Sequence, residues 1–186
     1  MNLYSSKEKE DLEFKDEGLK SKFFFVDPLF VDYFRGLDLN KFFSLKHKRS
    51  TIDSFLGKLL RKQPRTGKKQ KLFLFLKKAF ENLRSRKYNP LQLFVSSIEN
   101  CAPKEGYTMI LIRGSTLSKS VDYSPSKRLD LALSLLAKAI IKETFNSKKK
   151  IVSILENMLL SAGKNEPKNS AILKKNEIEN IAKASR

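Results

Sequence analysis

The sequence predicts a mainly α-helical protein: a six-helix bundle with one β-hairpin protruding between the third and fourth helices, and an N-terminal extension. Three observations lead to this fold class. Apolar residues recur at intervals of three and four in six separate stretches, which is the pattern of helices with one buried face. One stretch, at about 107–121, instead alternates around a turn sequence, as a hairpin does. Forty per cent of the 186 residues are apolar, which is enough for a core.

Residues 1–49 are expected to form an N-terminal arm, and residues 50–186 the helical domain. Met1–Lys20 is charged and mixed, and is predicted to be a tail that frays or is ordered by a partner. Phe23–Val26 is a candidate short strand, because aromatic and β-branched residues favour strands. The aromatic residues of 29–43 follow no steady period. This stretch is expected to cover the core or, alternatively, to pack onto a partner.

Three helices are predicted between residues 50 and 103. Ser50 or Thr51 is a suitable N-terminal cap for the first. Asn89 caps the third, in which Pro90 takes the first helical position, and Pro103 marks its end. The residues expected to face the core are Ile52, Phe55, Leu56, Leu59 and Leu60 in the first helix, Leu72, Phe75, Leu76, Ala79, Phe80 and Leu83 in the second, and Leu91, Phe94, Val95 and Ile98 in the third.

The hairpin is the feature around which the rest of the chain is organised. Tyr107–Ile112 is rich in β-forming residues, Arg113-Gly114-Ser115 is a turn sequence, and Thr116–Val121 returns with alternation. A ribbon that projects from a buried helix, with cations at the joint, is typical of a polyanion-binding protein.

The fourth helix should begin with Ser124 as its cap and Pro125 at its first position. Lys127 and Arg128 lie in the first turn, where the helix dipole disfavours cations unless an anion is present. The core face is expected to consist of Leu129, Ala132, Leu133, Leu136 and Ile140, widened by Leu131, Leu135 and Ala139.

Two further helices complete the chain. Asn146 or Ser147 is expected to cap the fifth, and Gly163 to stop it. The sixth runs from about Ala171 to the C-terminus. The inward residues are predicted to be Ile151, Ile154, Leu155, Met158 and Leu159 in the fifth helix and Ile172, Ile178, Ile181 and Ala182 in the sixth.

The chain carries a net charge of +18, from 38 Lys and Arg and 20 Asp and Glu. Residues 1–40 hold six basic and nine acidic side chains, so the positive excess belongs to the body. Such a charge favours a nucleic acid or an anionic surface as partner. For the loop Arg65–Lys71, contact with RNA phosphates is favoured over simple solvation. For Lys148–Lys150, RNA contact and solvation stay equally open.

Enzymatic and metal chemistry find no support in the sequence. The single Cys101 permits no internal disulfide, fits a reducing compartment, and cannot make a Cys/His zinc site with the single His47. The Gly67-Lys68-Lys69 run lacks the earlier glycine and the Ser or Thr of a nucleotide-binding loop. No paired acids, nucleophile motif or membrane-spanning apolar run stands out. We therefore expect no cofactor and no metal, and a cytoplasmic location.

Five segments, in order along the chain, carry a family likeness. They are RTGKKQK (65–71), NPLQLFVSSIENCAPKE (89–105), SVDYSPSKRLDLAL (120–133), FNSKKKI (145–151) and NSAILKKNEIENIAKASR (169–186). Together they resemble small-subunit ribosomal protein seven, the S-seven family. The branch is the archaeal and eukaryotic-cytosolic one, in which the eukaryotic protein is called ribosomal protein five of the small subunit. The likeness covers roughly residues 50–186.

The resemblance implies a structural protein that binds the 3′ major (head) domain of small-subunit rRNA and nucleates assembly of the head. It implies a hairpin near the exit-site tRNA and the path of the leaving mRNA. It also implies neighbours among small-subunit proteins nine, eleven, thirteen and nineteen. Contacts should be made mainly to phosphates and RNA shape. Base stacking is expected to be minor, because the aromatic residues lie mostly at core spacing.

The charge map and the resemblance together nominate two sets of site residues. Those expected to bind rRNA are Lys46, Lys48, Arg49, Arg65, Lys68, Lys69, Lys71, Arg86, Lys87, Lys119, Lys127, Arg128, Lys148, Lys149, Lys174, Lys175 and Arg186. Those expected near tRNA and mRNA, at the hairpin tip, are Ile112, Arg113, Gly114, Ser115 and Thr116. Lys119, Lys127 and Arg128 are predicted to anchor the joint while the tip projects beyond it.

Two other functions were weighed against this one. The second and third helices are compatible with the helix-turn-helix of a free nucleic-acid-binding regulator. However, the recognition helix would be Leu91–Asn100, which holds Glu99 and no Lys or Arg, a poor composition for a DNA groove. An RNA-modifying enzyme lacks any catalytic constellation.

Overall fold

The computed structural model describes residues 8, 11–23, 25, 50–61, 67–112, 114–145 and 147–186. Its elements, in chain order, are α2 (Glu17–Lys20), α5 (Thr51–Leu60), α6 (Lys69–Ser85), α7 (Pro90–Cys101), β1 (Glu105–Ile112), β2 (Ser115–Asp122), α8 (Pro125–Thr144), α9 (Ile151–Gly163) and α10 (Ser170–Ala184). The predicted fold class is confirmed, since the described residues form six longer helices, the short α2 and one antiparallel hairpin.

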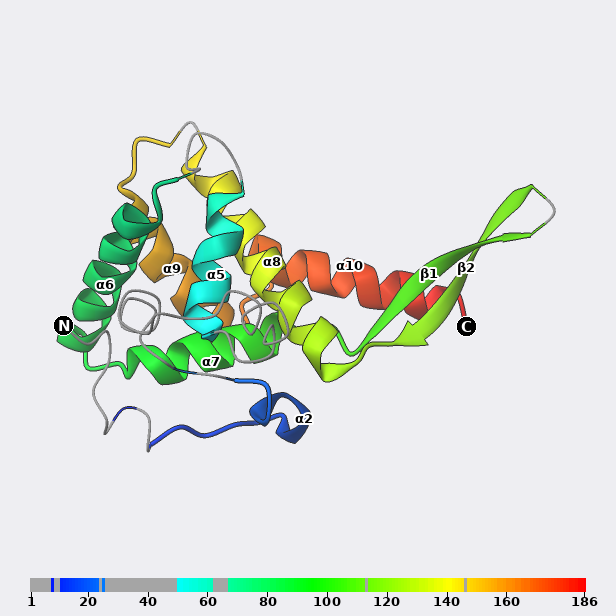
Figure 1. Ribbon diagram of the computed structural model, residues 1–186, viewed down its shortest axis with the longest axis horizontal. Coiled ribbons are helices and arrows are strands. Elements are labelled where there is room, and N and C mark those ends of the chain that lie inside the picture. The colour runs from blue at the N-terminus through cyan, green and yellow to red at the C-terminus, as the bar shows by residue number, and fades with distance from the viewer. Residues whose placement is uncertain are drawn as a thin grey trace, which may run out of the picture.

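The core lies where α7, α8 and α9 pack against one another, with α5 against α8 and α6 against α9 (Figure 1). Three fully buried rings mark its centre. Phe55 and Phe94 meet edge to face with their centroids 5.5 Å apart, and the Phe80 ring lies 6.4 Å from Phe94. Leu133 and Leu136 are 2 % and 0 % exposed, which confirms the predicted core face of α8.

Two predicted helix faces need correction. On α6, Phe73 is buried although it was not expected to be, and Phe75 is only half-buried. On α10, Ile181 was predicted to face the core but is 42 % exposed. The reason is that α10 extends beyond the bundle along the hairpin (Figure 1), and a two-stranded ribbon covers less of a helix than a bundle does.

Asparagine side chains start two of the helices. The Asn89 carboxamide oxygen accepts hydrogen bonds from the N–H groups of Leu91 and Gln92, at 3.1 and 3.2 Å. Pro90 takes the first position of α7, as predicted. In the same way the Asn169 side chain accepts from the Ala171 N–H at 2.9 Å and starts α10.

The limits of α9 differ from those predicted. Ser147 does not cap the helix, because its hydroxyl accepts from the Lys149 N–H in a local turn, and α9 begins only at Ile151. Asn146, the alternative cap, lies outside the described residues. Gly163 is the last helical residue, and the left-handed residue beyond the helix is Asn165, with φ 56°.

The hairpin pairs in register from Glu105 opposite Asp122 to Ile112 opposite Ser115. Ser115 therefore belongs to β2 and not to the turn, and Ile112 and Ser115 form the last pair of the ladder. Two-residue hairpin turns require positive φ, and Gly114 has φ 84°. The base of the hairpin packs against α10, while its distal half projects away from the bundle (Figure 1).

Residues 11–23 are packed onto the body, so the predicted fraying is wrong for this part of the tail. Leu19 is fully buried beside α8, and the rings of Phe14 and Phe23 lie 5.4 Å apart against the core. The backbone of Glu13 exchanges two hydrogen bonds with the Gln92 side chain, at 3.0 and 2.9 Å. Neither Phe23 nor Phe25 is in a strand. The aromatic stretch 29–43 lies outside the described residues.

Candidate nucleic-acid interface

The start of α6, the end of α8 and residues 147–150, which lead into α9, lie at one end of the helical body (Figure 1), and all three segments contain lysines. We call this surface the basic end and define it by Lys68, Lys69, Lys71, Lys142 and Lys148–Lys150. In the view of Figure 1 it lies at the top of the body, whereas the hairpin projects to the right. The structure thus brings together basic residues that are widely separated in the sequence.

Two helix N-termini open onto the basic end without a side-chain cap. The N-cap positions of α6 and α9 are Lys68 and Lys150, neither of which makes a cap hydrogen bond, and neither first turn contains an acidic residue. Unpaired N–H groups at a helix start attract anions, and cations there oppose the helix dipole unless an anion is bound. Bound phosphate groups would therefore stabilise both the uncapped N-termini and the lysines that lie beside them.

The lysines of the basic end differ in their partners. Lys69 pairs with Asp53, with Nζ 2.7 Å from Oδ1, and Lys71 Nζ lies 5.9 Å from the centroid of the Phe75 ring. Lys69 and Lys71 belong to the first turn of α6, so the predicted loop of residues 65–71 ends at Lys68. Lys68, Lys71 and Lys148–Lys150 are exposed and make no ion pair with another described residue.

Sequence reasoning missed two lysines of α8. Lys138 and Lys142 are both exposed near the C-terminal end of that helix. Because they are four residues apart, they lie on one helical face. That spacing is visible in the sequence, and it could have been read as a basic face that continues into Lys148–Lys150.

Several residues that were predicted to contact RNA form ion pairs with acidic residues of this chain. Arg86 bonds the buried Glu156, which also accepts from Asn82, so Arg86 has a structural partner. Lys174 pairs with Glu177, Lys175 lies 4.0 Å from Glu179, and Arg186 pairs with Glu105. Exposed pairs such as Lys174–Glu177 are weak and can exchange partners. Arg86 and Lys87 lie between α6 and α7, and Lys87 has a left-handed φ of 64°.

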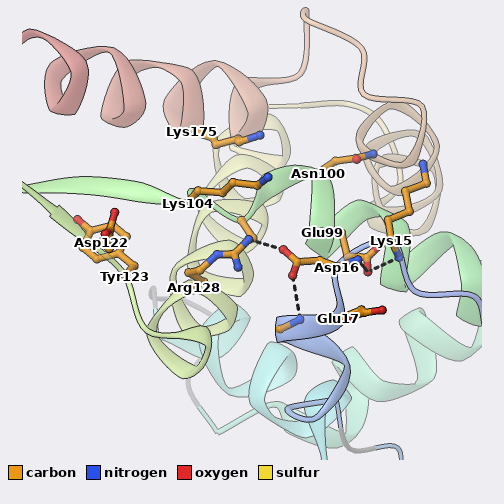
Figure 2. Close-up of a pocket in the computed structure, with 12 residues that line it drawn as sticks. Lys15, Asp16, Glu17, Glu99, Asn100, Lys104, Asp122, Tyr123, Arg128 and Lys175 are labelled. Atoms are coloured by element: carbon orange, nitrogen blue, oxygen red, sulfur yellow. Dashed lines mark hydrogen bonds and ion pairs between the residues drawn. The ribbon is translucent and has the colours of Figure 1, made fainter.

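Among the predicted cations that the structure describes, Arg128 is the most deeply placed. Its Nη2 lies 2.5 Å from Asp16 Oδ2 (Figure 2). Its Nε donates to the Pro103 carbonyl at 3.3 Å. The Arg128 side chain is only 11 % exposed. The sequence predicted that an anion must face this cation at the start of α8, and the anion that the structure supplies is the chain's own Asp16. The hydrogen bond to Arg128 lowers the pKa of the Asp16 carboxyl below its usual value.

The Arg128–Asp16 pair borders an open cleft of about 560 Å³ between the N-terminal segment, α7, the hairpin base and α10. Four cationic and four anionic side chains line it (Figure 2): Lys15, Lys104, Arg128 and Lys175, and Asp16, Glu17, Glu99 and Asp122. One Glu99 oxygen accepts from the backbone N–H groups of Lys15 and Asp16, at 3.1 and 3.2 Å. The Arg128–Asp16 pair and the hydrogen bonds to Glu99 therefore hold the N-terminal segment in place. The walls of the cleft carry no excess of positive charge.

The hairpin base is fixed by close packing around Tyr123. A Cβ on Gly106 would lie 1.9 Å from the Tyr123 ring, so only glycine leaves room for it. Lys127 Nζ lies 4.4 Å from the centroid of the same ring. On the α10 side, Glu179 accepts from the Lys104 N–H at 3.2 Å. Lys119 is exposed on β2, farther from the body.

The distal part of the hairpin, from Met109 to Ser118, presents apolar side chains to solvent, and from here on the name hairpin tip is used for this part. Met109 and Leu111 are 71 % and 72 % exposed, and Ile110, Ile112 and Leu117 are also exposed. Gly114, Ser115 and Thr116 complete the predicted tip and are exposed as well. The sequence 109–118 contains Arg113 as its only charged residue.

Five predicted site residues fall outside the described residues: Lys46, Lys48, Arg49, Arg65 and Arg113.

Three other properties of the described residues bear on function: metal binding, thiol reactivity and membrane insertion. It contains no group of three or more His, Cys, Asp or Glu side chains arranged to hold a metal ion. Cys101 is buried, and burial raises the pKa of its thiol to about 12. No helix among the described residues has the length and apolar character needed to cross a membrane.

Comparison with known proteins points to one family. The profile of the family described as "Ribosomal protein S7p/S5e" matches residues 39–186. Similar proteins named "Small ribosomal subunit protein uS7" occur in several archaea. The one from Thermoplasma volcanium is 36 % identical over 152 residues, covering 81 % of this chain and 83 % of its own length. The one from Methanothermobacter thermautotrophicus is 31 % identical and covers 98 % of each chain. The one from Methanothrix thermoacetophila is 30 % identical and covers 100 % of each.

Proposed function

The chain belongs to the ribosomal protein S7p/S5e family, and we propose that it is a structural constituent of the small ribosomal subunit. In this role it binds rRNA, contacts neighbouring ribosomal proteins and resides in the ribosome. Membership in a family of ribosomal structural proteins also supports a role that is not enzymatic.

The basic end is the observation that supports RNA binding most strongly. Its exposed lysines surround two uncapped helix N-termini on a rigid, well-packed body. Charged side chains held on such a body lose little freedom on binding, and a helix start directs several N–H donors at one phosphate. Paired RNA offers phosphates and shape rather than readable base edges in its deep groove, which matches a surface of this kind.

The finer assignment follows the family resemblance. We place the basic end on the 3′ major domain of small-subunit rRNA, where the protein would nucleate assembly of the head. The hairpin tip would then project toward the exit-site tRNA and the leaving mRNA. Small-subunit proteins nine, eleven, thirteen and nineteen are the expected neighbours. The near-absence of charge at the tip supports contacts of shape and apolar surface there, with phosphate binding left to the body.

A helix-turn-helix regulator is disfavoured by the packing of α7. The residues of α7 include no Lys or Arg, and Leu91, Phe94, Val95 and Ile98 are fully buried in the core. A recognition helix must expose a polar or basic face to a DNA groove. α7 has no basic side chain to present, and its partly exposed Gln92 and Glu99 form hydrogen bonds with the N-terminal segment.

Salt dependence of RNA binding tests the proposal. The variant replaces Lys68, Lys71, Lys148 and Lys149 by Gln, and the control replaces four exposed lysines elsewhere, Lys20, Lys78, Lys164 and Lys168. Both lose the same charge. Affinity for a transcript of the 3′ major domain is measured by filter binding across a range of salt concentrations.

The basic-end variant should bind more weakly and show a flatter plot of log affinity against log salt, because each lost phosphate contact reduces the slope by roughly one or less. The control should keep most of the slope. If the two variants lose affinity and slope equally, the basic end is not the RNA-binding surface.

A further inference from the structure

Phe145 is the most exposed large hydrophobic side chain among the described residues, at 78 %. It stands at the C-terminal end of α8, inside the basic end. An exposed phenylalanine of this kind adds nothing to the core. The role of the ring must therefore be inferred from the residues around it.

The backbone that leads to Phe145 is held by hydrogen bonds at the end of α8. The Phe145 N–H donates to the Ile141 carbonyl at 3.1 Å, which closes the last turn of α8. The Thr144 hydroxyl bonds the carbonyls of Ile140 and Ile141, at 2.9 and 3.0 Å. The ring therefore projects into solvent from the hydrogen-bonded end of a helix.

The surroundings of Phe145 are strongly basic. Lys138, Lys142 and Lys148–Lys150 flank it, and Glu143 is the only acidic residue between Asp130 and Glu156. The uncapped start of α9 follows directly. An aromatic ring with cations on both sides along the chain has the composition of a single-stranded nucleic-acid site, in which the ring stacks on a base and the cations hold the flanking phosphates.

We propose that Phe145 is a stacking platform for an unpaired RNA base at the basic end. The proposal rests on the proposed rRNA binding and adds to it a contact with a base, where the sequence predicted phosphate contacts and little stacking. An unpaired base presents an apolar face that a paired one hides within its helix. An apolar protein pocket would also accept a phenylalanine, but the ring's cationic surroundings match a polyanion better.

The chain contains no tryptophan, which makes a direct test possible. Phe145→Trp places a single fluorophore at the site, and Leu173→Trp places one at an exposed position on α10, away from the basic end. A transcript of the 3′ major domain is titrated into each. Stacking on a base should quench the first fluorophore strongly and leave the second nearly unchanged. Equal responses in the two variants would overturn the proposal.

Affinity and salt dependence separate stacking from phosphate contact. Phe145→Ala should weaken binding of the same transcript by about 5- to 150-fold, the range of single-base stacking losses. The slope against salt should not change, because no phosphate contact is lost. Phe145→Tyr should restore the affinity. Melting temperatures should match the parent's, because the exposed ring supports no core packing.

The outcomes distinguish this proposal from the one on which it rests. If the parent binds the transcript and Phe145→Ala binds it equally well, the stacking site is wrong and rRNA binding stands. The ring would then be assigned to a protein neighbour, which loss of the variant from assembled subunits would reveal. If the parent itself does not bind, the proposed function fails, and the stacking site fails with it.

Discussion

The basic end and the hairpin tip differ in charge, in the structure that supports them and in the apolar surface that they expose. The basic end consists of lysines on the ends of well-packed helices, and its side chains carry the charge that phosphate recognition needs. The tip is a two-stranded ribbon that projects from the body and exposes Met109 and Leu111 by more than two thirds. One surface is suited to long-range attraction of a polyanion, and the other to short-range contact of shape.

A protein with two such surfaces can hold one partner with the first and contact another with the second. Binding strength toward a polyanion comes from charge on a rigid support. Contact with a second, more distant partner requires a projecting ribbon whose base is held firmly by packing. Here Gly106, Tyr123 and α10 lock that base. Removing the tip should therefore leave the anchor intact, and weakening the anchor should leave the tip folded.

The largest expected effect concerns the packed support itself. Leu136 is fully buried at the centre of α8, so Leu136→Ala should lower the free energy of unfolding by about 2–5 kcal/mol through lost burial and a residual cavity. Leu111→Ala on the exposed tip should change it by less than about 0.5 kcal/mol. Thermal or urea melts of both variants check this. Equal losses would mean that the tip packs against the body.

The hairpin base comes next. Gly106→Ala would force the Tyr123 ring out of its position and separate it from Lys127, at a cost of about 1–3 kcal/mol. Gly57→Ala is the matched control. It lies in the middle of α5, where the added methyl group would meet nothing within 4 Å beyond its own helix turn, and it should stabilise the protein by up to about 1 kcal/mol. Amide hydrogen exchange in β1 and β2 should accelerate only in the first variant. Unchanged exchange there would show that Tyr123 does not lock the base.

A smaller effect should follow from the Asp16–Arg128 pair. Asp16→Asn should destabilise the protein at neutral pH, since it removes the carboxylate that faces Arg128. The pKa of Asp16 is lowered by folding, so its contribution is fully present above the unfolded-state pKa of 3.8 and is lost as the pH falls through the lower folded-state pKa. The parent and the variant should therefore differ at pH 7 and converge below pH 3.8. A difference that persists unchanged in acid would point to a packing effect of the substitution.

Local signals in the sequence predicted most of the fold. The Asn89-Pro90 start of α7 and the Leu133 and Leu136 face of α8 depend on neighbours within one or two turns, and both are confirmed. The start of α9 was misplaced because the Ser147 hydroxyl serves a local turn, a choice that the residue type alone does not decide. Ile181 was misjudged because periodicity shows which residues share a face, but not how far a neighbour extends along it.

The site was less predictable than the fold. Basic clusters in the sequence identified Lys68, Lys71, Lys148 and Lys149, which are exposed in the structure. Composition could not show that Arg128 meets Asp16, 112 residues away, because that pair depends on how the N-terminal segment crosses the body. Nor could it separate Phe145 from the core aromatics, because burial is set by tertiary packing and only the completed fold shows which ring is left outside.

One comparison tests the division between anchor and reach most directly. A hairpin variant in which residues 110–117 are replaced by Asn-Gly, a two-residue turn suited to such strands, is set beside the Lys68, Lys71, Lys148 and Lys149 to Gln variant. Binding of both to the 3′ major domain transcript is measured by filter binding at physiological salt. The shortened hairpin should bind nearly as tightly as the parent, because it loses only Arg113 from its charge, while the glutamine variant should bind at least tenfold more weakly. Loss of binding by the shortened hairpin, together with normal binding by the glutamine variant, would reverse the assignment of the two regions.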